Sequence, residues 1–83
     1  MINVLYFARL KEQLNTTSEE LEASSLSTIA DIIRQITARG GVWEKAFGNG
    51  QTVMMAVNQE MSDAAASVKD GDEVAFFPPV TGG

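Results

Sequence analysis

The sequence predicts an α+β fold, with a mixed β-sheet whose first and last strands lie side by side and parallel, covered by one main helix. The prediction depends on short apolar runs at residues 2–8 and 74–77, near the two ends of the chain, and on isoleucines that recur at helical spacing between them. Strands that are apolar on both faces belong in the middle of a sheet, so we expect these two runs to be its central strands.

The first expected strand covers residues 2–8, which are apolar except at Asn3. Because its apolar side chains alternate onto both faces, we expect both faces to be covered. Residues 9–17 are polar and are expected to form a turn-like connection. A second strand is expected within residues 18–23, with Leu21 facing the core.

The clearest local prediction is a helix that begins after Thr28. Its apolar stripe consists of four isoleucines at positions i, i+3, i+4 and i+7, namely Ile29, Ile32, Ile33 and Ile36. Thr28 and Asp31 are spaced to form a capping box, and the glycine pair at 40–41 is expected to end the helix. Trp43 and Phe47 lie four residues apart and are expected to cover the edge of the core from one short helical turn.

The rest of the chain is typical of strands joined by tight turns. We expect a strand over residues 52–57, a turn at 58–59 with a very short strand after it, an Asp-Gly-Asp turn at 70–72, and the last strand at 74–77. This order of elements is the β-grasp, or ubiquitin-like, layout. At 83 residues the chain is expected to form one domain.

The composition excludes several classes of function. The chain has no Cys and no His, and its net charge is −5. The lack of Cys removes disulfides, thiolate nucleophiles and cysteine metal sites. An acidic surface repels phosphate backbones, so no nucleic-acid partner is expected. Because no signal-like or bilayer-length apolar segment is found, we expect a soluble, cytoplasmic protein without a membrane partner.

The acidic residues around the last strand are expected to form turns rather than a metal site. They lack the spacing of a calcium-binding loop, so the sequence predicts no metal and no bound cofactor. These residues are Asp63, Asp70, Asp72 and Glu73.

The most informative segment is residues 78–83, Pro-Pro-Val-Thr-Gly-Gly, which we expect to form a flexible tail after a β-grasp domain of residues 1–77. Pro78 and Pro79 cannot donate to a sheet and favour extended geometry. Gly82 and Gly83 have no side chain and can enter a channel that a Cβ would block. Fully extended, the segment reaches roughly 20 Å at about 3.3 Å per residue.

The carboxylate of Gly83 is the reactive group that this composition leaves available. With a pKa of about 3.3–3.7, a terminal carboxylate is ionised at neutral pH, and it is a poor electrophile. Activation by ATP to an acyl-adenylate makes the acyl carbon reactive. Sulfide or an amine can then displace AMP, and sulfide gives a thiocarboxylate. We therefore expect the chemistry at the terminus.

Residues 70–83, Asp-Gly-Asp-Glu-Val-Ala-Phe-Phe-Pro-Pro-Val-Thr-Gly-Gly, resemble the carboxyl-terminal signature of the small subunit of molybdopterin synthase, the MoaD family. Residues 4–12 are similar to the first strand and following turn of that family, and residues 56–59 are similar to its middle strand. The tail is the specific part of the resemblance, since the other segments also fit other β-grasp families.

The resemblance implies a sulfur carrier that is a subunit of an enzyme, the sulfurtransferase molybdopterin synthase of molybdenum cofactor biosynthesis, with no catalytic side chains of its own. It implies that an adenylyltransferase related to ubiquitin-activating enzymes uses ATP to adenylate Gly83, which then becomes a thiocarboxylate. The implied partner is the large synthase subunit, in a tetramer of two small and two large subunits. There the tail donates sulfur to cyclic pyranopterin monophosphate to form the dithiolene of molybdopterin. By position, Gly83 carries the sulfur, Gly82 is the slender residue behind it, and Val80 and Thr81 line the channel of the partner.

Phe76 and Phe77 are adjacent on the last strand, so they must point to opposite faces. Only one of them can face the helix-covered core. We expect Phe77, which is nearer the tail, to contact the large subunit together with Pro78 and Pro79.

Other functions fit the same tail. The chain can be a sulfur carrier of another pathway, such as thiamine synthesis or tRNA thiolation. It can also be a ubiquitin-like modifier that forms isopeptide bonds to lysines, or a β-grasp binding module whose terminus is idle. Met54 and Met55 alternate across a strand and are interpreted as packing residues.

Overall fold

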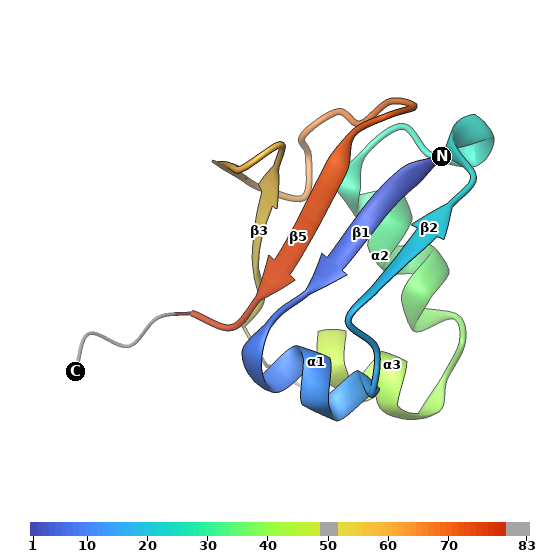
Figure 1. Ribbon diagram of the computed structural model, residues 1–83. Helices are drawn as coiled ribbons and strands as arrows, with labels where there is room; N and C mark the ends of the chain where they lie inside the picture. The colour runs from blue at the N-terminus through green and yellow to red at the C-terminus, as the bar shows by residue number, and fades with distance from the viewer. Residues whose placement is uncertain (49–51, 80–83) are drawn as a thin grey trace.

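In the computed structural model, which describes residues 1–48 and 52–79, the chain forms a five-stranded sheet in the order β2-β1-β5-β3-β4 (Figure 1). The strands are β1 (Ile2–Tyr6), β2 (Ser18–Leu21), β3 (Met54–Val57), β4 (Glu60–Ser62) and β5 (Glu73–Phe77). β1 pairs with β5 in parallel, whereas β2, β3 and β4 make antiparallel pairs. The predicted mixed sheet with adjacent, central first and last strands is confirmed.

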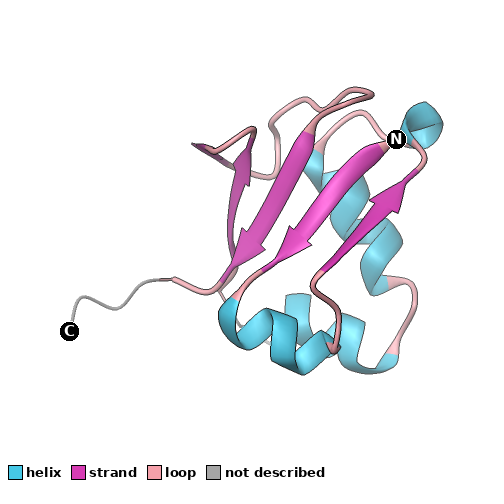
Figure 2. Cartoon of the chain, viewed as in Figure 1, coloured by secondary structure: helices cyan, strands magenta, loops and turns pink. Residues whose placement is uncertain are grey.

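The helices pack on one face of this sheet. They are α1 (Ala8–Leu14), α2 (Ile29–Thr37) and α3 (Gly41–Phe47), with a 3₁₀ turn, η1 (Ala23–Ser25), before α2. In Figures 1 and 2, α2 passes behind the strands and the other two helices lie at one end of the sheet, so that no described helix crosses the face turned to the viewer. The longest helix, α2, is the main helix expected from the sequence, and α1 and α3 complete the cover.

The expectation of a turn-like connection at residues 9–17 is wrong, because helix α1 occupies much of this segment. Its polar sequence contains two leucines four residues apart, Leu10 and Leu14, and both are buried in the core. The strand before it ends at Tyr6 rather than at residue 8, since Ala8 takes a left-handed φ of 53° and turns the backbone into the helix. Two buried positions in a polar segment are too few to reveal a helical stripe.

The start of α2 is capped as its sequence predicts. The Asp31 backbone N–H donates to Thr28 Oγ1 at 3.3 Å. The Asp31 carboxylate accepts from the backbone N–H groups of Ser27 at 2.9 Å and Thr28 at 3.1 Å, and these donors hold the pKa of Asp31 below its usual range. The helix ends at Thr37, and positive φ angles of 73° and 56° at the glycine pair 40–41 then turn the chain into α3.

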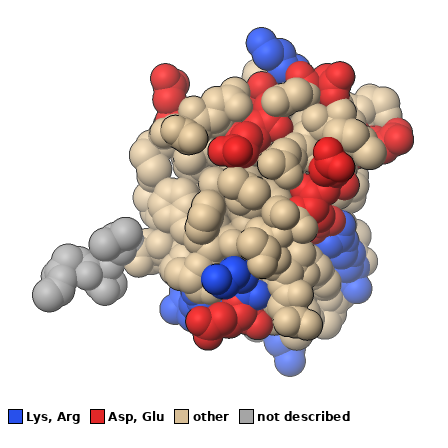
Figure 3. All heavy atoms as spheres, in the orientation of Figure 1, with Lys and Arg blue, Asp and Glu red and all other residues tan. Residues whose placement is uncertain are grey.

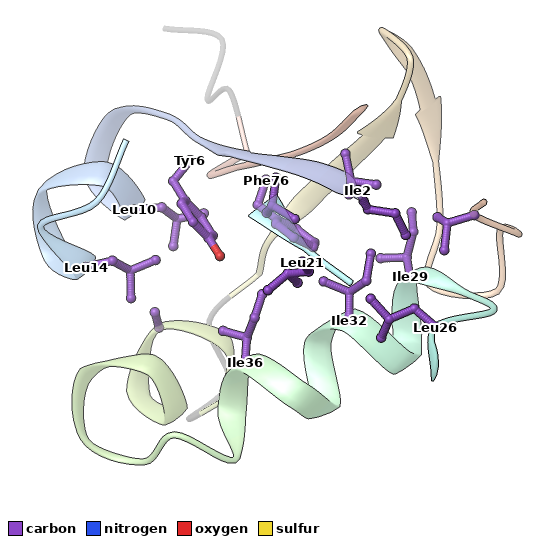
Figure 4. Close-up of a cluster of buried hydrophobic side chains, with 14 residues drawn as sticks. Ile2, Tyr6, Leu10, Leu14, Leu21, Leu26, Ile29, Ile32, Ile36 and Phe76 are labelled. Carbon is purple, nitrogen blue, oxygen red and sulfur yellow. The ribbon is translucent and has the colours of Figure 1, made fainter. Parts of the chain in front are cut away.

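The core lies between the helices and the covered face of the sheet (Figure 4). Its fully buried large side chains are Tyr6, Phe76, Ile2, Leu10, Ile29, Ile32, Ile36, Val4 and Val74. Trp43 stands edge-on to Tyr6 with ring centroids 5.7 Å apart, and Phe47 meets Phe76 in the same way at 5.1 Å. Both aromatic residues of α3 are half-buried against the core, so their expected role as core cover is confirmed.

The expectation that β1 and β5 are covered on both faces is wrong. Burial alternates along both strands. Val4 and Tyr6 in β1, and Val74 and Phe76 in β5, are fully buried. The alternate residues of each strand, which point to the other face, are exposed or half-buried. The helices cover one face only, so the apolar side chains on the other face lie at the surface. The central position of the two strands follows from their pairing and not from burial on both sides.

A partly buried network ties β2 to the connection between α2 and α3. Arg39 donates from both terminal nitrogens to the Glu19 carboxylate, at 2.9 and 2.6 Å, and its guanidinium carbon lies 4.4 Å from the centroid of the Trp43 ring. The Tyr6 hydroxyl donates to the same carboxylate at 2.7 Å. The guanidinium, followed by this hydroxyl, holds the pKa of Glu19 below its usual range, and burial raises the pKa of Tyr6.

Replacing Glu19 with Gln is expected to lower the free energy of unfolding by about 1 kcal/mol at neutral pH, because a bidentate ion pair at a partly exposed site becomes a hydrogen bond from the guanidinium to a neutral amide. Since the folded pKa of Glu19 lies below its unfolded value, the advantage of the wild type is complete above about pH 5 and is lost as the pH falls below about 4.3. Urea denaturation of both proteins across this range measures the difference. A difference that does not change with pH would contradict the role of the carboxylate.

Asp72 is a buried carboxylate, 8% exposed, that organises the turn before β5. One carboxylate oxygen accepts from the backbone N–H of Lys69 at 2.9 Å, and the other accepts from the side-chain amide of Asn58 at 3.1 Å. The side-chain oxygen of Asn58 in turn accepts from the Glu73 backbone N–H at 3.0 Å. The turn between β3 and β4 is thereby joined to the start of β5, and the predicted turns at 58–59 and 70–72 are confirmed.

Replacing Asp72 with Ala is expected to lower the free energy of unfolding by about 1–3 kcal/mol, because two donors in a partly buried turn lose their acceptor. Asp70 belongs to the same turn but is exposed, so its replacement with Ala is the matched control and should cost much less. Urea denaturation of the two variants measures both changes. Equal losses would show that the buried hydrogen bonds of Asp72 do not stabilise the turn.

Candidate functional site

The predicted tail begins where β5 ends. The strand stops at Phe77, Pro78 is half-buried and Pro79 is exposed, and neither proline nitrogen can donate to a further strand. Because β5 runs parallel to β1, it ends at the side of the sheet opposite the N-terminus (Figure 1). The remaining predicted site residues lie outside the described residues: Val80, Thr81, Gly82 and Gly83.

Phe76 and Phe77 point to opposite faces of β5, as the sequence predicts. Phe76 is fully buried, and its ring stacks on that of Tyr6 with centroids 6.2 Å apart. Phe77 is half-buried and pairs with Met54 of β3 on the face that the helices leave uncovered. The residue predicted to contact a partner therefore lies at the surface, directly before the first proline of the tail.

An apolar surface extends from Phe77 across the uncovered side of the sheet. We call it the open face, and cross-strand pairing assigns to it Leu5, Met54, Ala56, Met61, Ala75 and Phe77. Met61 is its most exposed member at 60%, whereas Ala56 is buried. In Figure 3, which views this side in the orientation of Figure 1, uncharged atoms fill the middle of the molecule and the region around the end of β5. Contiguous apolar surface of this kind marks protein–protein contacts.

The open face gives way to polar side chains toward the start of β5. One row across three paired strands consists of Glu20, Asn3 and Glu73. In Figure 3, acidic side chains gather over the upper and right-hand parts of the molecule, and a smaller acidic group lies among basic side chains at the lower edge. Along the direction of β5, the surface thus changes from acidic to apolar.

Phe7 is an exposed aromatic residue near the tail that the sequence prediction does not include. It follows β1, is 48% exposed, and donates its backbone N–H to the Phe76 carbonyl at 3.1 Å. This bond places Phe7 beside the end of β5, where Pro78 begins. The sequence contains a signal for this residue. Alternation along β1 puts Leu5 and Phe7 on the face opposite the core, and an apolar face outside the core is typical of contact with another protein.

The described side chains offer a binding surface and no enclosed catalytic site. Within residues 1–48 and 52–79, no three His, Cys, Asp or Glu side chains come together as metal ligands. A shallow hollow of about 710 Å³ lies away from the tail, with Met1, Leu26 and Val68 among its lining residues. None of the described helices has the length and apolar character needed to span a bilayer.

Comparison with known proteins confirms the resemblance seen at residues 70–83. A model of the ThiS family matches residues 4–83. The molybdopterin synthase sulfur carrier subunits of Escherichia coli (strain K12) and Haemophilus influenzae are 40% and 37% identical to the chain, each over 100% of both proteins. Among solved structures, SAMP1 from Haloferax volcanii has a TM-score of 0.79 at 25% identity, covering 99% of this chain and 98% of SAMP1.

The family match includes both central strands and the whole of the tail segment. The two relatives also align with the chain from end to end, so the match does not depend on the tail alone. The chain therefore belongs to the ThiS family, and the relatives that it resembles over its full length are molybdopterin synthase sulfur carrier subunits.

Proposed function

We propose that the chain is the sulfur-carrier subunit of a molybdopterin synthase and that the carboxylate of Gly83 carries the sulfur. The observation on which this depends is the junction at Phe77, where a central strand meets two prolines at the border of the open face. The junction gives residues 78–83 a fixed origin on the folded body, beside a surface suited to a partner. The names of relatives at 37% and 40% identity support the same function.

The proposed cycle begins with activation of the terminal carboxylate. A carboxylate oxygen of Gly83 attacks the α-phosphorus of ATP in an adenylyltransferase related to ubiquitin-activating enzymes, and pyrophosphate leaves. A sulfur nucleophile at the oxidation level of sulfide then displaces AMP from the acyl carbon, and the product is a thiocarboxylate at Gly83. In the large subunit this sulfur is donated to cyclic pyranopterin monophosphate, and two such transfers complete the dithiolene of molybdopterin. Because the chain has no Cys, no internal thiol can intercept the acyl-adenylate.

In this proposal the open face docks against the large subunit and the tail extends into it. Phe77 and Met61 supply apolar contacts from β5 and β4, and Phe7 adds an aromatic ring beside the tail. The tail residues then follow in order. Pro78 and Pro79 lead away from the sheet, and Val80 and Thr81 line the channel of the large subunit. Gly82 has no side chain, so the tail stays narrow directly before Gly83. Two small and two large subunits form the proposed complex, in which the large subunit supplies the catalytic side chains.

Reconstitution of the reaction tests the proposal. The chain is incubated with the adenylyltransferase, ATP and sulfide, and then with the large subunit and cyclic pyranopterin monophosphate. Molybdopterin is expected only when all of these components are present. Product formation without ATP would contradict adenylation of Gly83. No product with every component present would contradict the assignment to molybdopterin synthase.

Rescue of a molybdenum-cofactor-deficient strain separates this function from sulfur carriage in thiamine synthesis or tRNA thiolation. We expect the chain to rescue such a strain and to leave a thiamine-requiring or thiolation-deficient strain unrescued. The reverse pattern would assign the chain to another sulfur pathway of the same chemistry.

A second candidate function is attachment to other proteins, and the likeness to SAMP1, a small archaeal modifier protein, favours it. A modifier would join Gly83 to lysine amines through the same acyl-adenylate. Tandem mass spectrometry of tryptic digests from cells that express the chain would then find remnants made of residues 70–83 on lysines, because Lys69 is the last Lys or Arg of the chain. A protein that acts only as a sulfur carrier leaves none.

A further inference from the structure

The open face carries a methionine whose oxidation would change the polarity of the surface. Met61 lies on β4 opposite Ala56 of β3 and is 60% exposed. Among the large apolar side chains of residues 1–48 and 52–79, it has the greatest exposed fraction. The sequence has four methionines and no cysteine, so methionine is the readily oxidised sulfur of its side chains.

The four methionines differ in accessibility and in position. Met55 pairs with Phe76 on the core side of the sheet and packs against the buried cluster. Met54 is half-buried beside Phe77. Met1 is 53% exposed but precedes β1, at the opposite end of the sheet from the tail. An oxidant in solution therefore reaches Met61 and Met1 first, and of these two only Met61 belongs to the open face.

We propose that Met61 is a modification site at which hydrogen peroxide reversibly switches off docking of the large subunit. The inference rests on the proposed function, since it takes the open face to be the docking surface. The thioether sulfur attacks one peroxide oxygen, and an S–O bond forms as the O–O bond breaks. The other oxygen leaves as water after proton transfer. The sulfur loses two electrons and the peroxide gains two, so that no further reactant is needed.

The sulfoxide places a strong hydrogen-bond acceptor within an apolar contact. Burying this oxygen against an apolar partner surface without a donor is unfavourable. We expect docking to weaken about tenfold or more, the effect typical of losing one important interface contact. The fold should not change, because the buried core cluster does not include Met61. Methionine sulfoxide reductases reverse the modification.

The test uses the full chain in its carboxylate form, so that no terminal sulfur competes for peroxide. Titration calorimetry gives the affinity for the large subunit after graded peroxide treatment, and peptide mass mapping gives the oxidised fraction of each methionine. Wild-type affinity is expected to fall about tenfold as Met61 sulfoxide accumulates and to recover after treatment with the reductase, with an unchanged melting temperature. In the variant Met61→Leu, Met1 still oxidises, and the affinity is expected to be the same before and after peroxide.

The variant Met61→Gln imitates the polarity of the sulfoxide with a side chain of similar length and needs no oxidant. It is expected to bind the large subunit weakly without peroxide treatment. Undiminished affinity of wild-type protein that is fully oxidised at Met61 would overturn the switch while leaving the docking proposal intact. An equal loss of affinity in Met61→Leu would also overturn it, because the loss would then come from another residue. If untreated wild type did not bind the large subunit, the docking proposal would fall, and this inference with it.

Discussion

Deletion of Gly82 and Gly83 is expected to abolish sulfur transfer while leaving the fold intact. The shortened chain still ends in a carboxylate, but this group belongs to Thr81, lies about 7 Å short of the original position at about 3.3 Å per residue, and follows a β-branched side chain. Because β5 ends at Phe77, the deletion removes nothing from the described sheet or core. Molybdopterin formation should fall to background. The free energy of unfolding in urea should stay within about 0.5 kcal/mol of the wild type.

Gly82→Ala is the matched control for this deletion, because it keeps the length of the tail and its terminal carboxylate and adds only one Cβ. We expect it to reduce sulfur transfer at least about tenfold, since a channel built for a bare backbone places the reactive carbon poorly when a methyl group is added. A truncated chain that transfers sulfur at the wild-type rate would show that Gly82 and Gly83 are not needed for sulfur transfer. A truncated chain that unfolds would show that the tail stabilises the body.

Replacing Phe77 with Ala is expected to weaken binding of the large subunit about 30-fold and to cost little stability, since the side chain is half-buried on the open face. Replacing its neighbour Phe76 with Ala has the opposite expected effect. That ring is fully buried between Tyr6 and Phe47, so its loss should lower the free energy of unfolding by about 3–5 kcal/mol. This is a large share of the roughly 4–12 kcal/mol expected for a chain of this length.

Each of the two phenylalanine variants is the control for the other, because they remove the same side chain from adjacent positions of one strand. Titration calorimetry against the large subunit and urea denaturation separate binding from stability. If Phe77→Ala bound as tightly as the wild type, the open face would not be the docking surface. If Phe76→Ala were fully stable, the ring would not be part of the core.

The sequence predicts the elements whose apolar residues recur with a clear period. The isoleucine stripe and the capping residues Thr28 and Asp31 define α2, and both central strands are found with the expected parallel pairing. Helix α1 cannot be recognised in this way, because Leu10 and Leu14 are its only buried residues and a left-handed Ala8 begins it. That conformation is uncommon for alanine and leaves no mark in a pattern of apolar residues.

The candidate site shows a different limit of sequence patterns. A strand buried between two layers and a strand that reserves one apolar face for another protein have the same apolar pattern. Met54 and Met55 illustrate the ambiguity, since both are interpreted as packing residues but only Met55 packs against the core cluster. The sheet order and register are needed to gather Leu5, Met61 and Phe77 on one surface. The roles of residues 80–83, in contrast, are predicted from the sequence alone and stay predictions, because these residues lie outside the described part of the chain.

The central claim is that the carboxyl group of Gly83 accepts sulfur, and intact-mass spectrometry tests it most directly. The chain is incubated with the adenylyltransferase, ATP and sulfide, and its mass is compared with that of a sample lacking ATP. We predict an ATP-dependent gain equal to the replacement of one oxygen by one sulfur, which fragmentation locates at Gly83. An unchanged mass, or a sulfur located at any other residue, would contradict the claim.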